Sequence, residues 1–390
     1  AAKTAIKAKG TPDFSKIAPN DTEEDGLYMA EDDEGESYYY RGAVKNNYVS
    51  FAGFIWRIIR RNGDGSVRLI YSGKSPSDTG ETVTILNSRY SSEIFDPTYA
   101  GYKYNEKFSL HENNGTTGYN GFTNTQKYNF GTGYSFDEST KKFILTGNIQ
   151  QLTWKYNHGE IVSSNLYSCL NTSCSVVYKV TGYQSDYMMT VQPISYSSAS
   201  YVDAVTNTTD SHIKRTIDNW YKNNLISYAS YLADETFCND RSVTGGSGYL
   251  MASSTYYGTY KRLYTNREPS LKCVQDNDKF KVLNTRAKLE YPIALITADE
   301  VAMAGGVIDA NKNYNYYLCN GRAFWTLSPS YFNSINSLIS VWSVRSTGDL
   351  NPWTHPAYQY EVRPVISLKS DIQIINGDGS TLNPYVVKIL

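Results

Sequence analysis

The chain has 390 residues, a formal net charge of −1, and 40% hydrophobic against 19% charged residues. This composition can bury a sizeable core, which excludes a generally disordered chain, and the length favours two subdomains over one. The near-neutral balance predicts no nucleic-acid partner, because nucleic-acid binding normally needs a clearly basic surface. The 36 tyrosines, with abundant Ser, Thr, Asn and Gly, predict a β-rich protein with a hydrated exterior.

The first twenty residues precede the predicted strands. Their opening string, AAKTAIKAKG, is basic and alanine-rich, so 1–20 is expected to be a linker that begins with the end of a longer helix, or a frayed end. No run approaches the ~20 apolar residues of a membrane helix, and no signal peptide is recognisable. We therefore expect either a cytosolic protein or a chain whose leader or anchor has been removed.

Residues 21–95 open the main domain with consecutive strands. Residues 38–71 are rich in aromatic and β-branched side chains, and the Asn-Gly-Asp-Gly run at 62–65 is typical of a hairpin turn. In 54–59 one face is apolar and the other combines isoleucine with Arg57, which predicts a strand covered on both sides for part of its length. Residues 96–199 are punctuated by Gly, Asn, Ser and Tyr, and we predict a β-rich insertion subdomain there.

The main domain is expected to resume over 200–390 with a helix. Ile213, Ile217 and Trp220 recur at helical spacing after a cap at Asp210 or Ser211. Further on, 291–296 reads as a buried strand. It leads into a short helix in which Thr297 and Glu300 have capping-box spacing and two glycines at 305–306 end the helix. The chain closes with a hairpin about 377–379, expected to pair near the N-terminal strands.

The most informative stretch is 324–368. Its ends read as core strands, one carrying Trp325 and the other Val365, and between them 330–361 is polar and dotted with aromatic residues. A polar, aromatic segment held between apolar strands is typical of a rigid scaffold that presents a contact surface. The alternative is a long surface loop, but strand-like alternation at 341–344 favours recognition.

Five cysteines bear on the cellular compartment. Cys169 and Cys174 flank a polar stretch as a hairpin-closing disulfide would, a second bridge could join Cys238 and Cys273, and Cys319 is left over. Five reduced thiols in a cytosolic protein are the alternative. No spacing suggests zinc, and an oxidising, extracellular setting is favoured.

Catalytic constellations are sparse. The four histidines are scattered, no phosphate-binding glycine loop is present, and carboxylate pairs such as Asp299-Glu300 have local helix-end explanations. Asp349, His355 and Arg363 could form an acid–base site, although Arg363 more simply supports a strand end. We predict no catalytic residue, no metal site and no cofactor, and therefore no enzyme.

Several strings carry a family resemblance. They are YYYRGAV, YLADETFCNDRS, YPIALITADEVAMAGG, FWTLSPSYF, VRPVISL and GDGSTLNPYVV. Together they resemble a family of uncharacterised surface proteins of gut Firmicutes and related bacteria, whose members often carry a prepilin-type N-terminal segment. The pattern also resembles the C-type-lectin-like fold shared with formylglycine-generating enzymes. In that group, some proteins are targets of diversity-generating retroelements, which randomise exposed residues.

The resemblance implies an α+β, C-type-lectin-like fold, an antiparallel sheet with a few helices, carrying the β-rich insertion. It implies that Trp342 and Val344 are scaffold. The side chains it places on the ligand-facing surface are Ser334, Asn336, Ser337, Ser343, Arg345, Thr347, Asp349, Asn351, Trp353, Thr354, His355, Tyr358, Gln359 and Tyr360. The calcium and sugar motifs of true lectins are absent, so calcium-dependent sugar binding is not expected.

The sequence thus predicts an extracellular, surface-displayed, adhesin-like binding protein. Its partner would be a surface protein or glycan of a host or bacterial cell. The alternative is a pilin-like subunit that assembles into a surface filament, and a weaker one is an enzyme on the formylglycine-generating fold.

Overall fold

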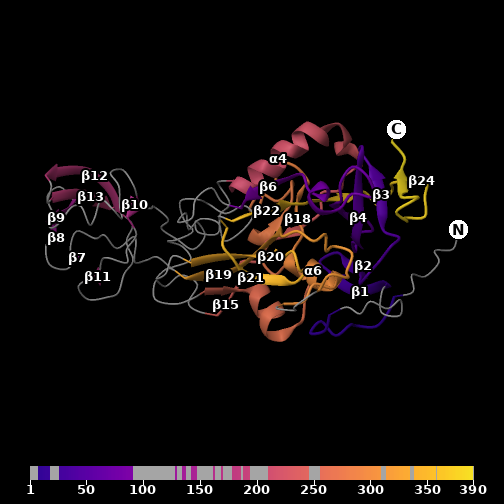
Figure 1. The fold of residues 1–390 in the computed structure, drawn as a ribbon, viewed down its shortest axis with the longest axis horizontal. Coiled ribbons are helices and arrows are strands. Elements are labelled where there is room, and N and C mark those ends of the chain that lie inside the picture. The colour runs from indigo at the N-terminus through magenta and orange to yellow at the C-terminus, as the bar shows by residue number, and fades with distance from the viewer. Residues whose placement is uncertain are drawn as a thin grey trace.

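The structure is a computed structural model. It describes residues 8–17, 26–90, 210–245, 255–308, 313–333, 338–356 and 358–389, and the backbone of short strands between 128 and 193. The chain is mixed α+β, mostly sheet with few helices (Figure 1), which confirms the coarse fold class.

The larger sheet has nine strands and joins the N-terminal strands to the C-terminal hairpin. Its hydrogen-bonded order is β18-β23-β5-β4-β3-β25-β24, with β2 paired to β4 and β1 to β2. The last strand, β25, runs parallel to β3, as the predicted pairing of the hairpin near the N-terminal strands requires. The strands are β1 Gly26–Asp32, β2 Gly35–Arg41, β3 Tyr48–Phe51, β4 Phe54–Arg61, β5 Val67–Tyr71, β18 Ala294–Leu295, β23 Pro364–Leu368, β24 Ile374–Asn376 and β25 Tyr385–Val387.

The second sheet has seven strands and contains the segment singled out above. Its order is β15-β16-β19-β20-β21, and β22 pairs with both β19 and β6. The β19–β22 pairing is parallel and the others are antiparallel. The strands are β6 Leu86–Arg89, β15 Val243–Gly245, β16 Thr255–Tyr257, β19 Phe324–Asn333, β20 Leu338–Val344, β21 Leu350–Thr354 and β22 Gln359–Val362.

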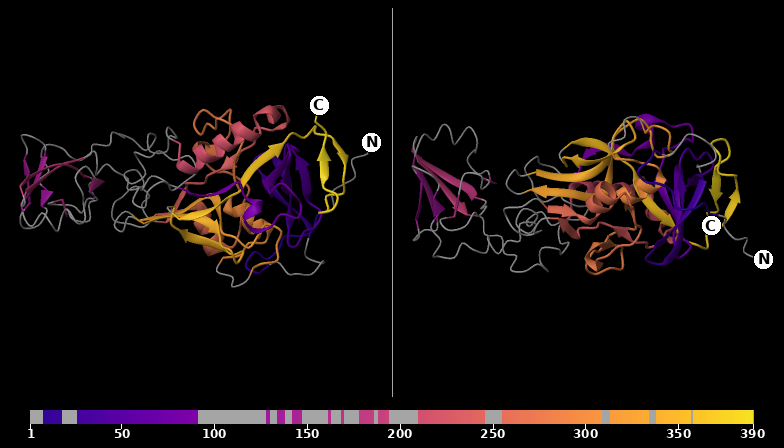
Figure 2. Two further views of the ribbon diagram at one scale, coloured as in Figure 1. Left: turned by 45° about the horizontal axis from the view of Figure 1, so that its top comes forward. Right: turned by 90° about the horizontal axis from the view of Figure 1, so that it is seen from below.

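Strands within the predicted insertion form sheets of their own. Among the described residues, β7 to β13 pair only with one another, in the order β10-β12-β13-β9-β8 and as the pair β11-β7 (Figure 2). The strands are β7 Tyr128–Asn129, β8 Tyr134–Asp137, β9 Lys142–Thr146, β10 Ile161–Val162, β11 Ser168–Cys169, β12 Tyr178–Ser185 and β13 Met188–Pro193. A further short pair joins β14 Phe237–Cys238 to β17 Lys279–Phe280.

The helices follow their local signals. α4 (His212–Asn224) is capped by Ser211, whose side chain accepts from the Lys214 amide, and it buries Ile213 and Ile217. α6 (Ala298–Ala304) has the predicted Thr297–Glu300 capping box. The other helices of the described residues are α5 (Gly258–Tyr260), a π-helix at Lys261–Asn266, and 3-10 turns at Gly80–Val83, Ile226–Tyr231 and Asp276–Asp278.

One hydrophobic core spans both sheets. Trp56, Trp325, Trp342 and Val365 are fully buried in it, as the sequence predicts for Trp325 and Val365. The strands carrying those two residues lie in different sheets, but β22 connects them: it pairs with β19 and continues into β23. The segment between them is therefore fixed at both ends.

Candidate functional site

The segment 330–361 forms the end of β19, then β20, β21 and most of β22. β20 lies between β19 and β21 in the sheet. The alternation predicted at 341–344 is confirmed as part of β20, and Trp342 and Val344 are fully buried, in agreement with a scaffold role. A long unstructured loop is thus excluded for the described part of the segment.

Four side chains expected to face a ligand are buried. They are Ser343, Asp349, Asn351 and Thr354. The Ser343 and Thr354 hydroxyl oxygens lie 2.6 Å apart, and Asn351 Nδ2 donates to the same Thr354 oxygen at 2.8 Å. Asp349 accepts from Arg345 Nη1 at 2.8 Å. The prediction that these four line an outward face is wrong, because their polar groups are hydrogen-bonded within β20, β21 and the turn between them.

Trp353 is the exception on β21. Its neighbours in the strand are buried, yet its own side chain is 42% exposed. The ring centroid lies 5.4 Å from those of Tyr260 and Tyr331, at interplanar angles of 63° and 74°. It lies 6.3 Å from that of Tyr264 at 72°. Such edge-to-face contacts restrict the indole while leaving part of it in solvent.

Two of the three supporting rings, those of Tyr260 and Tyr264, belong to a row of tyrosines that the sequence analysis missed. Tyr256, Tyr260 and Tyr264 recur every four residues, and their centroids are 4.6 and 4.8 Å apart. Tyr256 also lies 5.0 Å from Tyr331. Spacing of four in TYYGTYKRLYTN is a signal for one helical face. In the structure Tyr260 and Tyr264 lie in helix, while Tyr256 lies in β16. Nothing local in that string identifies Trp353 as the residue it supports. We call these five residues the aromatic cluster.

A second group of rings accompanies β22. Tyr358 is 57% exposed, and its centroid lies 6.2 Å from those of His355 and Tyr360. The ring centroids of Tyr360 and the buried Trp325 are 4.8 Å apart, so Tyr360 anchors this group of rings to the core. Burial lowers the pKa of His355, so this ring is mostly neutral at pH 7. The group therefore presents an uncharged aromatic surface.

The remaining predicted contact residues divide into two sets. Gln359 is exposed, and Arg345 and Thr347 are partly exposed. Ser334, Asn336 and Ser337 lie outside the described residues. The predicted side chains that reach solvent are therefore Arg345, Thr347, Trp353, His355, Tyr358, Gln359 and Tyr360.

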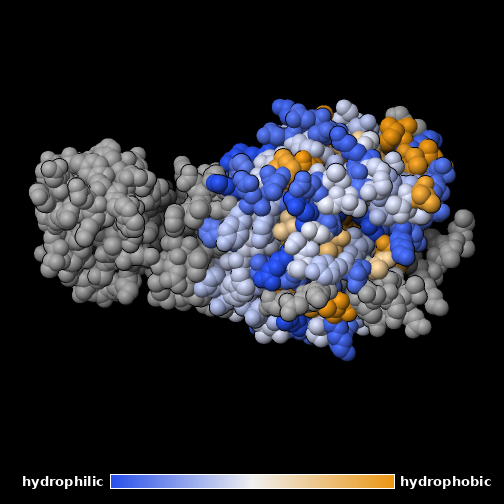
Figure 3. Space-filling model, in the orientation of Figure 1, coloured by the Kyte–Doolittle hydropathy of each residue, from blue (hydrophilic) through white to orange (hydrophobic). Residues whose placement is uncertain are grey.

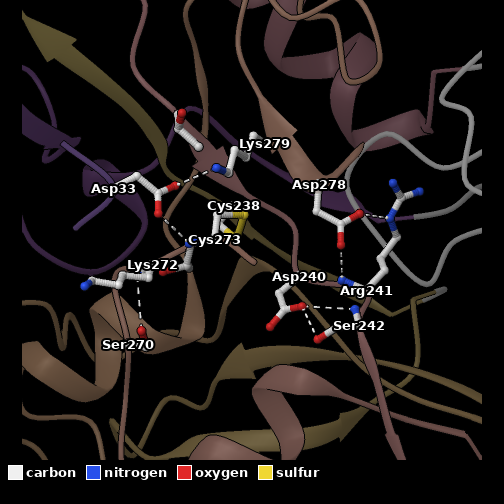
Figure 4. Close-up of a disulfide and its surroundings, with 12 residues drawn as sticks. Asp33, Cys238, Asp240, Arg241, Ser242, Ser270, Lys272, Cys273, Asp278 and Lys279 are labelled. Atoms are coloured by element: carbon white, nitrogen blue, oxygen red, sulfur yellow. Dashed lines mark hydrogen bonds and ion pairs between the residues drawn. A yellow bond between two sulfur atoms is a disulfide. The ribbon is translucent and has the colours of Figure 1, made fainter. Parts of the chain in front are cut away.

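A disulfide and an ion-paired arginine hold the tyrosine row. Cys238 and Cys273 are bonded as predicted, across a sequence separation of 35 that encloses the row (Figure 4). Within this loop, Arg262 Nη2 lies 2.9 Å from Asp299 Oδ2 and Arg262 also pairs with Asp240. The loop is thereby tied to the start of α6.

The other cysteines are partly placed. Cys319 is free, as predicted, and burial raises the pKa of its thiol. Cys319 is therefore mainly protonated at neutral pH, which does not favour a reactive thiolate. Cys174 lies outside the described residues, so the proposed pairing with Cys169 is not placed.

A small, strongly charged pocket lies beside the disulfide. Its volume is about 30 Å³, enough for about two water molecules. Arg60 Nη1 lies 2.7 Å from Asp32, and Arg60 and Arg68 both contact Glu300 Oε1, at 3.1 and 3.0 Å. Arg60, Arg68, Asp32 and Glu300 thus form a buried ion-pair network at this pocket, which joins β1, β4 and β5 to α6.

Glu235 gives this network a pH response. Burial is the main cause that raises the pKa of Glu235 to about 7, and a hydrogen bond with Asp64 acts in the same direction while Arg68 opposes it. Between the ordinary value of 4.5 and about 7, the folded state holds a proton that the unfolded chain has lost. The free energy of unfolding therefore falls as pH rises through this window.

We expect Glu235→Gln to reduce that fall, because the amide does not titrate. Urea denaturation of both proteins across the window measures it, and the two curves of unfolding free energy against pH should converge at low pH and separate as pH approaches 7. Parallel curves would contradict the attribution of this pH dependence to Glu235.

The acid–base site considered from the sequence is not assembled. Arg363 is buried and donates to the backbone carbonyl of Leu318 at 2.7 Å, while Asp349 pairs with Arg345. Arg363 thus supports a strand end, as its simpler interpretation predicts. Across the part of the chain that the structure describes, no three His, Cys, Asp or Glu side chains gather in a way that could hold a metal ion.

Comparisons of the chain with protein-family models, with curated proteins and with solved structures found no match. The description of the site therefore rests on the distances between its side chains and on their exposure. Its central feature is one exposed tryptophan, Trp353, in contact with three tyrosine rings.

Proposed function

We propose that this chain is an extracellular, surface-displayed, adhesin-like protein that binds a surface protein or glycan of a host or bacterial cell through Trp353 and the rings along β22. The observation that carries the proposal is the combination of 42% exposure at Trp353 with three ring contacts. A large side chain that is already restricted loses little entropy on binding. Tyr358 and Gln359 extend the exposed contact area.

The finer fold assignment, a C-type-lectin-like domain with a β-rich insertion, belongs to the same proposal. Two features support it. The first strands and the last hairpin share one sheet, and the described strands between 128 and 193 pair among themselves. In such an arrangement the recognition segment is mounted on paired strands, which position side chains more rigidly than a loop does.

The extracellular location is supported by the Cys238–Cys273 disulfide, because such bonds persist mainly in oxidising compartments. Among the described residues, no helix combines the length and the apolar character that crossing a bilayer demands.

Replacing Trp353 by alanine is the direct test. We expect binding to intact bacterial cells or to an array of bacterial and host glycans to weaken by at least about tenfold, since buried tryptophans dominate the energetics of most interfaces. Tyr314→Ala is the matched control, because Tyr314 is a 49% exposed aromatic residue outside the site. Equal binding by both variants and the original chain would place the ligand elsewhere.

The filament-subunit alternative is favoured by a different observation, the exposed aliphatic side chains at the C-terminal hairpin, which are those of Ile374, Ile375, Leu382 and Ile389. The two functions predict different results for Trp353→Ala. A filament subunit would assemble normally with this substitution, whereas a binding protein would lose its ligand.

A further inference from the structure

An apolar cavity of about 190 Å³ opens on one face of the nine-stranded sheet. Four adjacent strands build its floor, each with one aliphatic side chain: Val49 of β3, Ile58 of β4, Val67 of β5 and Leu368 of β23. Val49 and Leu368 are buried in the hydrophobic core, and Ile58 and Val67 pack against it. The floor is therefore continuous with the core, and strand pairing fixes its shape.

The cavity lies where the helical cover of this face ends. Phe51 follows Val49 by two residues, so both side chains lie on the same face of β3. The Phe51 ring is covered by Tyr228 and Tyr231 of the 3-10 turn, with centroids 5.6 and 6.1 Å away. The turn reaches the sheet at Tyr231, whose carbonyl accepts from the Lys369 amide at 3.0 Å. Val49 borders the cavity instead of this cover.

The rim of the cavity is mostly apolar. Ile372 and Tyr385 pack against the core, and Ile374 of β24 is 49% exposed. Figure 3 shows hydrophobic residues, in orange, gathered at the end of the molecule where Figure 1 places β24. Water in such a cavity finds few hydrogen-bond partners. A small apolar group that enters it is therefore stabilised by leaving water.

The volume limits the size of that group. An apolar cavity of roughly 150 Å³ holds a benzene molecule, so this one has room for about six or seven carbon atoms. Sites for drug-sized ligands are larger, at roughly 300–1,000 Å³. The cavity therefore suits one short hydrocarbon group.

The charged side chains at the rim are basic. Lys369 is the only charged residue among the described residues that line the cavity, and its exposed side chain forms no ion pair within the described chain. Asp371, the nearest acidic residue in the sequence, does not line the cavity. A Cβ on Gly65 would meet Arg61 Nη2 at 3.0 Å and Ser370 Cβ at 3.2 Å, so Arg61 lies close to the cavity-lining Ser370. The rim therefore favours a negative charge.

We propose that the cavity binds a small soluble amphiphile, an aliphatic carboxylate whose tail of about six carbon atoms fills the cavity and whose carboxylate lies at Lys369. Charge complementarity favours this anion over an amine with a similar tail. The volume favours a free molecule over a membrane lipid, whose chains are much longer. The cavity lies in the nine-stranded sheet and Trp353 in the seven-stranded sheet, so this binding is independent of the function proposed above.

A series of straight-chain carboxylates from butanoate to decanoate tests the size of the site, with saturation-transfer difference NMR of the full chain as the measurement. We expect the affinity to rise about fourfold with each added methylene while the tail still enters the cavity. The rise should level off beyond octanoate, because further carbons remain in solvent. Absence of binding, or an affinity that does not depend on chain length, would overturn the proposal.

Hexanoate, hexylammonium and hexan-1-ol test the charge of the head. Hexanoate should bind more tightly than hexylammonium. Lys369→Gln should weaken hexanoate binding about two- to fivefold, the range for one exposed ion pair, and leave hexan-1-ol binding unchanged. Lys222→Gln is the matched control, because it replaces an exposed lysine of α4 outside the cavity. Equal affinity for hexanoate and hexylammonium would contradict an anionic head.

Val67→Phe tests the cavity itself. The ring would occupy the volume, so hexanoate affinity should fall at least about tenfold, equivalent to excluding two methylene groups. Val274→Phe is the matched control, since Val274 is 74% exposed outside the cavity. Circular dichroism checks that Val67→Phe is folded, and the exposed Lys369→Gln tests the site if it is not. Unchanged binding in folded Val67→Phe would overturn the proposal, as would adsorption to phosphatidylglycerol vesicles by a chain that binds no hexanoate.

Discussion

Replacing Glu300 by alanine is expected to lower the free energy of unfolding by about 3–5 kcal/mol, the usual effect of removing one partner from a buried ion pair. Glu300 is 2% exposed and accepts from Arg60 and Arg68, of which Arg68 is itself fully buried. Burial opposes the ionisation of Glu300, yet Arg68 and Arg60 hold its pKa below the usual value. The substitution would leave two buried guanidinium groups without this carboxylate, and it would also remove the capping box of α6.

Urea denaturation measures the effect. Glu81→Ala is the matched control, because Glu81 also pairs with an arginine but is 74% exposed, and solvent-exposed pairs contribute little. Glu300→Gln should fall between the original chain and Glu300→Ala, since the amide can still accept hydrogen bonds without supplying charge. Equal loss in Glu81→Ala and Glu300→Ala would show that burial does not set the strength of these pairs.

The second large loss of stability is expected when the Cys238–Cys273 disulfide is removed by a double substitution to serine. The sequence separation of 35 corresponds to about 4 kcal/mol of stability in the chain-entropy model. The enclosed loop carries Tyr256, Tyr260 and Tyr264, so Trp353 should become more mobile as well. We expect a lower urea midpoint and a weaker near-ultraviolet circular dichroism signal from the aromatic cluster.

Substitution is preferable to chemical reduction here, because a reductant would also act on any bond formed by Cys169 or Cys174. Cys319→Ser provides the control for loss of a thiol, since Cys319 is free. If the double variant kept both its urea midpoint and its aromatic signal, the loop would be held mainly by Arg262 and its two carboxylate partners.

The two surfaces that could carry a function, one aromatic and one aliphatic, lie on different sheets. The aromatic cluster and the rings along β22 lie on the seven-stranded sheet, while the apolar hairpin lies at an edge of the nine-stranded sheet. A ligand-binding defect in Trp353→Ala and, under the filament alternative, an assembly defect in Leu382→Asp should therefore be separable, because residues without shared partners usually act independently.

The sequence by itself determined the features that depend on neighbours a few residues away. The Thr297–Glu300 capping box, the α4 helix with its Ser211 cap, and the 62–65 turn all follow from short-range hydrogen bonds or dihedral preferences. The coarse fold class and the Cys238–Cys273 bridge were also correctly predicted.

Only the tertiary structure decided which polar and aromatic residues reach solvent. Ser343 and Thr354 look like surface residues in the sequence, but they satisfy each other between two paired strands, whereas Trp353 remains outward. Likewise, the sequence explains Glu300 as a helix-capping residue. Its ion pair with Arg68 is not visible in any local pattern, because the two residues are 232 positions apart. Burial depends on which distant strands meet, and no local pattern encodes that meeting.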